Sequence, residues 1–194
     1  MKPLKRIFES REAVFAGFLV ATLGAGCVTP GGGGTELFNG KNLDGWEVTD
    51  FAGGGAIKVK DGEIHMAMGE LISGINLAHE NIPRTNYELE AEAMKLDGND
   101  FFCGLTFPVG DTFASFIPGG WGGTVVGLSS IDGMDAAENE TATFKQFKTH
   151  QWYHFRVRVT PGKIQCWVDD EMVVDLLLED RAIALRAGPI ELSV

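Results

Sequence analysis

Three acidic residues alternate along one predicted strand. Residues 87–94 read YELEAEAM, so Glu88, Glu90 and Glu92 fall on one face of the strand and the residues between them on the other. Carboxylates at this spacing can supply a general base or hold a cation. The alternative is a solvated strand face whose charge is balanced by Arg156 and Arg158 on a neighbouring strand.

A second alternating run carries the other titratable candidate. Residues 154–159 read HFRVRV, which puts His154 on the same face as Arg156, directly after a Trp-Tyr pair. An imidazole titrates close to neutral pH and can act as an acid or a base. We therefore take His154 as a candidate catalytic residue, with a structural role as the alternative.

Two tryptophans could form stacking surfaces for a sugar. Trp167 shares its strand face with the polar Lys163, Gln165 and Asp169, and an aromatic ring among polar groups suits a pyranose, whose C–H faces are apolar. Trp121 is flanked by two glycines on each side, in GGWGG, which lets the backbone turn tightly near a ligand. The alternative for Trp167 is a ring that packs on the sheet or under a loop. The alternative for Trp121 is a hairpin corner packed on the sheet.

Two loops are rich in oxygen ligands. The first holds Asp97, Asn99 and Asp100, and residues 132–140, DGMDAAENE, form the second. Calcium binds such oxygens, so a divalent cation is a candidate cofactor, although turn chemistry alone also explains these residue types. No CxxC or HExxH spacing is present, so no zinc site is indicated.

The elements that must position these residues are strands. From Thr35 onward the apolar residues repeat with a period of two, and Gly and Pro signals separate the runs. No segment keeps an apolar stripe with a helical period over three turns, so helices are short at most. Many short alternating strands predict a sandwich of two packed antiparallel sheets.

The first residues predict export. Residues 1–11 are basic and polar, residues 13–26 are apolar and rich in small residues, and Cys27 follows at once. The apolar run is shorter than the roughly 20 residues that cross a bilayer, so residues 1–26 are predicted to be a signal peptide. Cys27 resembles the acylated cysteine of a bacterial lipobox, with plain secretion as the alternative. Residues 27–34 are a glycine-rich tether and residues 35–194 the folded domain.

The export prediction implies a cellular location for the protein and a net charge for its mature chain. Position 28 is not Asp, the signal for inner-membrane retention, so we expect a protein anchored by lipid to the outer membrane, on its periplasmic or surface side. Residues 1–26 hold four basic and two acidic side chains, so the formal charge changes from -11 for the whole chain to -13 without them. Such a surface repels phosphate backbones, which makes nucleic acid an unsuitable partner. Cys103 and Cys166 are predicted to be buried thiols, with a disulfide as the alternative.

Several segments together carry a family resemblance. LFNGKNLDGWEV (37–48), VKDGEIHM (59–66), YELEAEAM (87–94), QWYHFRVRV (151–159) and IQCWVDDEMVVD (164–175) resemble, in order and spacing, the DUF1080 family of 3-keto-disaccharide hydrolases, or 3-keto-glucoside lyases and hydratases. In its middle, which begins with DGNDFFCGLTFPVG (97–110), the sequence is instead similar to a secreted planctomycete-type subgroup with GGWGG (119–123) and NET (139–141). The resemblance covers residues 36–193.

The resemblance implies a fold and a chemistry. The fold would be a concanavalin- or laminin-G-like jelly roll with a groove on its concave face. The chain ends at GPIELSV, where such domains continue with another strand, so the last strand is expected to be missing. The implied activity is on oxidised glucosides, in which a 3-keto group acidifies the C2 proton and allows elimination of the glycosidic bond.

The resemblance singles out one of the candidates. Glu92 matches the family's glutamate on the long central strand and becomes the candidate base, beside His154. Glu90, Asp100, Trp121, Arg156 and Trp167 are the candidate substrate contacts. The sequence thus predicts an exported carbohydrate-active enzyme, with a non-catalytic carbohydrate-binding module of the same fold as the alternative.

Overall fold

The computed structural model describes residues 13–15, 20–23, 34–70, 72–78 and 81–185. Within these residues the regular elements are all strands, and the strand pairs are antiparallel. No helix in the described part of the chain is long and apolar enough to cross a membrane. The prediction of an all-β sandwich is confirmed.

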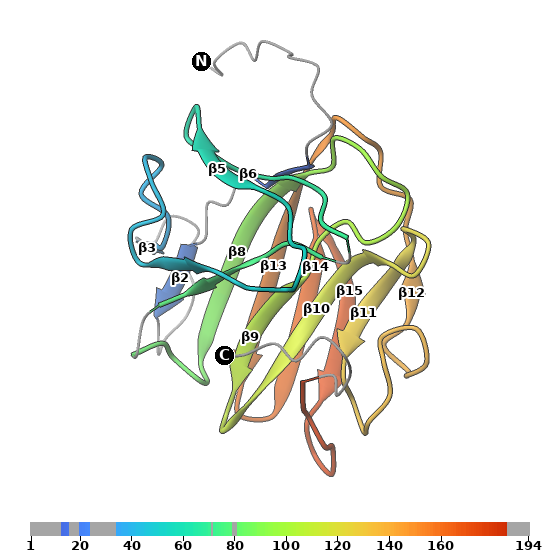
Figure 1. Ribbon diagram of the computed structural model, residues 1–194. Helices are drawn as coiled ribbons and strands as arrows, with labels where there is room; N and C mark the ends of the chain where they lie inside the picture. Colours follow the sequence, from blue (N-terminus) through green and yellow to red (C-terminus); the bar gives the residue numbers. More distant parts are fainter. Residues whose placement is uncertain (1–12, 16–19, 24–33, 71, 79–80, 186–194) are drawn as a thin grey trace.

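The larger sheet has nine strands, in the order β15-β14-β13-β8-β1-β6-β5, with β2 paired to β8 and to β3. Its strands are β1 (Ala13–Phe15), β2 (Val20–Leu23), β3 (Thr35–Glu36), β5 (Ile57–Lys60), β6 (Glu63–Met66), β8 (Tyr87–Met94), β13 (Trp152–Thr160), β14 (Lys163–Val168) and β15 (Glu171–Leu177). The β5–β6 hairpin extends from the end of this sheet (Figure 1).

The second layer is a four-stranded sheet, which lies in front of β8, β13, β14 and β15 in Figure 1. Its order is β12-β11-β10-β9, with β9 (Leu105–Val109), β10 (Thr112–Gly120), β11 (Val125–Ser129) and β12 (Thr143–Phe144). A separate pair joins β4 (Trp46–Val48) to β7 (Ile75–Leu77).

The core lies between the two sheets and follows from the alternation of each strand. The positions of β8 that face the core are apolar: Tyr87, Leu89, Ala91 and Ala93. The glutamates take the alternate positions on the outer face, where Glu88 is also buried. The strands β13 and β14 contribute apolar residues at alternate positions that are fully or almost fully buried: Phe155, Val157, Val159, Ile164 and Val168. The facing sheet contributes Phe107, Phe116, Val126 and Leu128.

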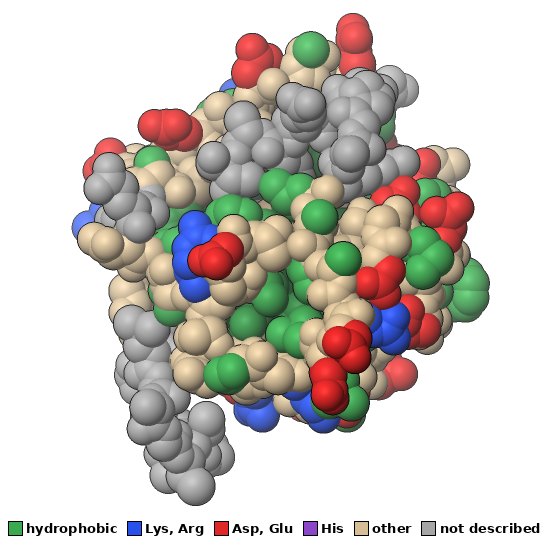
Figure 2. Space-filling view, turned by 90° about the horizontal axis from the view of Figure 1, so that it is seen from below, with side chains coloured by type: hydrophobic (Ala, Val, Ile, Leu, Met, Phe, Trp, Pro, Cys, Tyr) green, Lys and Arg blue, Asp and Glu red, His purple; other side chains and the backbone are tan. Residues whose placement is uncertain are grey.

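Apolar side chains are exposed at one end of the sandwich. Figure 2 shows this end, which lies at the bottom of Figure 1, with hydrophobic side chains gathered in the middle of the face and charged side chains around them. Apolar area still open to solvent at the end of a two-layer sheet fold is ordinary, because neither layer closes over the ends of the strands.

Two cysteines belong to this core. Cys103 and Cys166 are both buried and both free thiols. Burial raises the pKa of Cys103 to about 12 and the pKa of Cys166 well above its ordinary value. The prediction of two buried thiols is therefore confirmed over the disulfide, and neither thiol is activated as a nucleophile.

Two strands come from the segment that the sequence assigns to the export signal. β1 and β2 pair with β8, with Val20 opposite Glu90 and Thr22 opposite Glu88. Cleavage before Cys27, which stays a prediction, would remove both strands from the β8 edge. Cys27 itself and residues 28–33 of the tether lie outside the described residues.

Candidate functional site

The acidic strand and the basic strand lie side by side on the outer face of the large sheet. β8 and β13 pair in a register that places His154 opposite Glu92, Arg156 opposite Glu90 and Arg158 opposite Glu88. Since residues opposite each other in an antiparallel pair point to the same face, three carboxylates and three nitrogen-bearing side chains share one surface. We call these six residues the β8–β13 face.

The charges on the β8–β13 face are partly paired. Arg158 forms an ion pair with Glu88. This pair fits the alternative hypothesis, in which arginines of a neighbouring strand balance the charge of the glutamates. Glu90 approaches His154 across a diagonal, with Oε2 3.5 Å from Nε2. Glu92, the nearest carboxylate to the end of the strand, is exposed. The face therefore offers an exposed carboxylate next to an imidazole that a second carboxylate contacts.

Hydrogen bonds fix the backbone of His154. Asp169, in the turn after β14, accepts a hydrogen bond from the His154 backbone N–H at 2.9 Å. The Asp169 N–H donates in turn to the His154 carbonyl at 2.7 Å. These two bonds continue the β13–β14 ladder by one pair beyond Phe155 and Val168, which keeps the imidazole at a fixed height on the sheet.

Trp167 supports this face. The Arg156 guanidinium carbon lies 4.2 Å from the centroid of the Trp167 ring, and that of Arg158 lies 5.3 Å from it. Only 9% of Trp167 is exposed. Because cations already cover the ring, the arrangement favours Trp167 as a support that orients Arg156 and Arg158 by cation–π contact over a stacking surface for a sugar.

Trp121 and Asp100 lie on the other side of the molecule. Trp121 follows β10 and packs against Ile117 and Val125, which alternate with the core residues Phe116 and Val126 and therefore face away from the core. The Asp100 side chain accepts a hydrogen bond from the Gly122 N–H at 2.8 Å. The structure thus brings together Glu90, Glu92, His154, Arg156 and Trp167, and places Asp100 and Trp121 on the opposite face.

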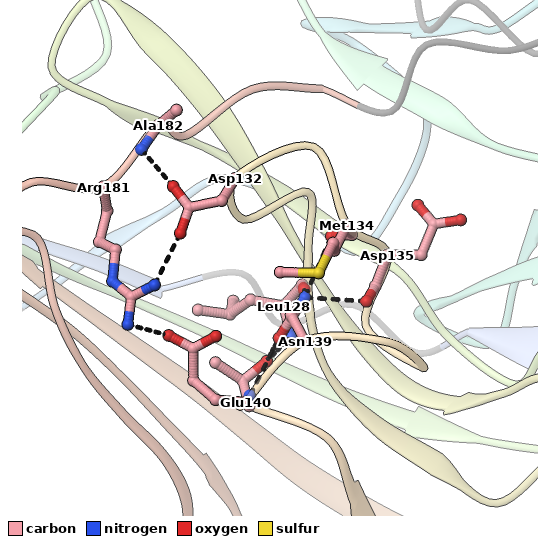
Figure 3. A network of polar contacts seen from close by, with 9 residues as sticks. Leu128, Asp132, Met134, Asp135, Asn139, Glu140, Arg181 and Ala182 are labelled. Carbon is pink, nitrogen blue, oxygen red and sulfur yellow. Dashed lines mark hydrogen bonds and ion pairs between the residues drawn. The ribbon is translucent and has the colours of Figure 1, made fainter.

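The second acidic loop is held together by its own side chains (Figure 3). Asn139 donates to the carbonyls of Leu128, Met134 and Asp135 at 2.8, 3.1 and 2.9 Å. Its oxygen accepts from the backbone N–H and the hydroxyl of Thr141 at 2.9 and 2.6 Å. Asn139 is therefore the centre of the 130–141 loop.

A second set of contacts ties this loop to the chain after β15. Asp132 accepts from the Ala182 N–H at 2.8 Å and from Arg181 at 2.6 Å, and Arg181 also pairs with Glu140 (Figure 3). The Ala182 N–H and the Arg181 guanidinium hold the pKa of Asp132 below its ordinary value. The side-chain oxygens of Asp132, Asn139 and Glu140 thus make contacts within the loop and with residues 181 and 182. Among the described residues no group of three or more His, Cys, Asp or Glu side chains could hold a metal ion.

Two hollows among the described residues lie elsewhere. One of about 290 Å³ is lined by residues 48–51, 53–55, 57, 73 and 74, near β4 and β5. Another, of about 410 Å³, lies beside Arg181 and the end of β15. Neither includes a residue of the β8–β13 face or Trp121.

Sequence reasoning missed one candidate. Phe101 is 46% exposed and its ring lies 5.1 Å from that of Trp121, with the planes inclined by 50°. The next residue, Phe102, is in the core. The signal that could have found Phe101 is the period of two, because in an extended FF pair one ring must face outward when the other is buried.

Comparison with known proteins assigns the family. A sequence model described as a 3-keto-alpha-glucoside-1,2-lyase-like domain matches residues 33–194. The chain belongs to this family. Membership of the 3-keto-alpha-glucoside-1,2-lyase-like family, together with the all-β sandwich, indicates a carbohydrate-related role. Neither the curated proteins nor the solved structures gave a match.

Proposed function

We propose that this protein is an exported, carbohydrate-active enzyme that cleaves 3-keto-glycosides by elimination on the β8–β13 face. The observation that carries the proposal is the exposed Glu92 beside the Glu90–His154 pair, with Arg156 on the same surface. Family membership supports this choice of substrate class.

The chemistry needs a base and an acid in neighbouring positions. Glu92 takes the C2 proton, which the 3-keto group acidifies, and the C2–H electron pair forms the enolate. The enolate then forms the C1–C2 double bond as the C1–O bond breaks, and the leaving oxygen takes a proton from His154. The products are an unsaturated 3-keto sugar and the free alcohol. Addition of water across the double bond gives the 3-keto sugar of net hydrolysis.

The remaining residues position the reacting groups. Glu90 contacts the imidazole of His154 and is a positioning residue for it. Arg156, held above the Trp167 ring, brings a cation to the surface on which the enolate oxygen develops charge. A cation of this kind stabilises the transition state more than the neutral ketone.

The roles are separated by variants and by the leaving group. Glu92→Gln should lower turnover of a 3-keto-glucoside by about 10²–10⁴-fold, the usual contribution of a general base, with substrate affinity within a few-fold. His154→Gln should lose as much on an alkyl glycoside but recover on a nitrophenyl glycoside, whose leaving group needs no acid. Glu47→Gln, an exposed carboxylate on β4, is the control.

Two outcomes would refute the proposal. Full turnover by Glu92→Gln would exclude it as the base. Absence of turnover in the parent protein, with binding of the glycan retained, would favour the non-catalytic carbohydrate-binding module instead.

A further inference from the structure

The pair Phe101–Trp121 is a second aromatic feature, far from the acid–base residues. Both side chains lie on the outer face of the four-stranded sheet, because Trp121 packs on Ile117, Val125 and Ala136 rather than on the core. We call the two rings the aromatic platform. The β8–β13 face lies on the outer face of the other sheet, so the two surfaces look away from each other.

The backbone of Trp121 is held in an unfavourable conformation. Its φ is +43°, a left-handed value that costs energy for any residue with a Cβ and that glycine adopts freely. The neighbouring contacts hold it there, since Asp100 accepts a hydrogen bond from the Gly122 N–H at 2.8 Å. A strained residue of this size, kept where glycine would fit better, points to a use for the ring itself.

The glycines around Trp121 let the two aromatic segments meet. A Cβ at Gly120 would lie 3.2 Å from the Phe101 ring, so that ring rests directly on the β10 backbone. A Cβ at Gly123 would lie 2.8 Å from the Asn99 carbonyl oxygen. The 99–102 segment therefore lies tightly against the turn, and Phe101 remains 46% exposed with the Trp121 ring 5.1 Å away.

We infer that the aromatic platform is a carbohydrate-binding subsite for a neutral glycan, separate from the β8–β13 face. The two rings, inclined by 50°, form a cradle for the apolar C–H surface of a pyranose. Asp100 is exposed and accepts a hydrogen bond from the Gly122 N–H with one carboxylate oxygen, and a carboxylate can accept further hydrogen bonds from sugar hydroxyls. Asp97 and Asp100 in this loop, in a chain of net charge -11, would repel uronic acids, so the glycan is neutral.

This inference takes the carbohydrate class of its ligand from the proposed function and is otherwise independent of it. The glycan it binds needs no 3-keto group. A protein with both surfaces would hold a glycan chain on one face while it processes an oxidised sugar on the other.

Calorimetric titration of the full-length protein with maltohexaose, cellohexaose and hexagalacturonic acid tests the subsite. We expect binding of at least one neutral hexasaccharide and none of the acidic one. Phe101→Ala and Trp121→Gly should each weaken the affinity by at least about fivefold, and Trp121→Phe should retain most of it. Trp121→Gly relieves the backbone but removes a ring that packs on Ile117 and Val125, so a circular dichroism spectrum must show that the variant is folded before its binding is compared. Leu177→Ala, which removes a side chain that is 61% exposed on β15 of the large sheet, is the control and should bind as the parent does.

The outcomes separate the two proposals. If neither neutral hexasaccharide binds, or if Phe101→Ala and Trp121→Gly bind as the parent does, the subsite is refuted, whatever the turnover of 3-keto-glucosides. Glu92→Gln, on the opposite face, should keep the hexasaccharide affinity. Loss of that affinity in Glu92→Gln would place the glycan on the β8–β13 face and overturn the inference.

Discussion

Replacing Asn139 by alanine should loosen the whole 130–141 loop, because this one side chain makes five hydrogen bonds in and beside the loop. The amide has two N–H groups, which face three carbonyls, and one oxygen, which accepts two bonds from Thr141. Counting one bond for each N–H and two for the oxygen, at about 1 kcal/mol each, gives about 4 kcal/mol. Water can reach part of the space at a residue that is 5% exposed, so we expect a loss of about 2–4 kcal/mol.

Urea unfolding followed by tryptophan fluorescence measures this loss, with Asn99→Ala as the control. Asn99 is exposed, and its replacement should change the free energy of unfolding by less than about 0.5 kcal/mol. Asn139→Asp sharpens the test, since it sets a buried carboxylate against three carbonyl oxygens. Its pKa in the folded state should rise, so its destabilisation should be largest at pH 7 and should shrink as the pH falls toward about 4.

A loss below about 1 kcal/mol for Asn139→Ala, or an Asn139→Asp variant whose destabilisation ignores pH, would refute the assignment of Asn139 as the centre of the loop. The loop also carries Ala136, which packs beneath Trp121. Asn139→Ala should therefore weaken hexasaccharide binding as well as folding.

Three further predictions follow from the core, the Arg181 contacts and the export segment. Phe155 is fully buried and its ring lies 5.7 Å from that of Phe102, so Phe155→Ala should cost about 3–5 kcal/mol in denaturant unfolding, and a change under about 1 kcal/mol would mean that the strand faces are reversed. The pKa of Asp132 is lower in the folded than in the unfolded protein, so Asp132 stabilises the fold above its unfolded pKa, and this stabilisation is lost as the pH falls through its folded pKa. Asp132→Asn should therefore make the loss of folding stability less steep between about pH 4 and 2. An unchanged pH profile would contradict this. A fatty-acid analogue should label the parent protein in cells and leave Cys27→Ser unlabelled, whereas equal labelling would exclude acylation at Cys27.

The period of two predicted most of the fold. The alternation in residues 87–94 and 154–159 gave both the core face and the polar face of β8 and β13, because burial on one side of a sheet leaves little freedom in register. It could not give the pairing partner of each strand. Trp167 lies under Arg156 because of the β13–β14 register. The hairpin sets this register, and it cannot be predicted from the local sequence.

The relative placement of the candidates was beyond the sequence. Trp121 and Glu92 are each outward-facing, but they belong to different sheets, and only the packing of the two layers decides that they point in opposite directions. The contact between Asp132 and Arg181 was hidden because these residues are distant in sequence and meet only where the chain returns after β15. The sequence did indicate that this loop was rich in oxygen, and the structure assigns those oxygens to the loop and to Arg181.

The central claim is abstraction of the C2 proton of a 3-keto-glucoside, and product analysis in D₂O tests it most directly. The purified protein is incubated with a 3-keto-glucoside and, in parallel, with the unoxidised parent glucoside, and the products are followed by mass spectrometry. The proposed reaction predicts that the oxidised substrate alone is consumed and that the hydrated sugar product carries one deuterium at C2. Equal cleavage of both glucosides, or cleavage of the oxidised one to a hydrated sugar without deuterium at C2, would contradict it.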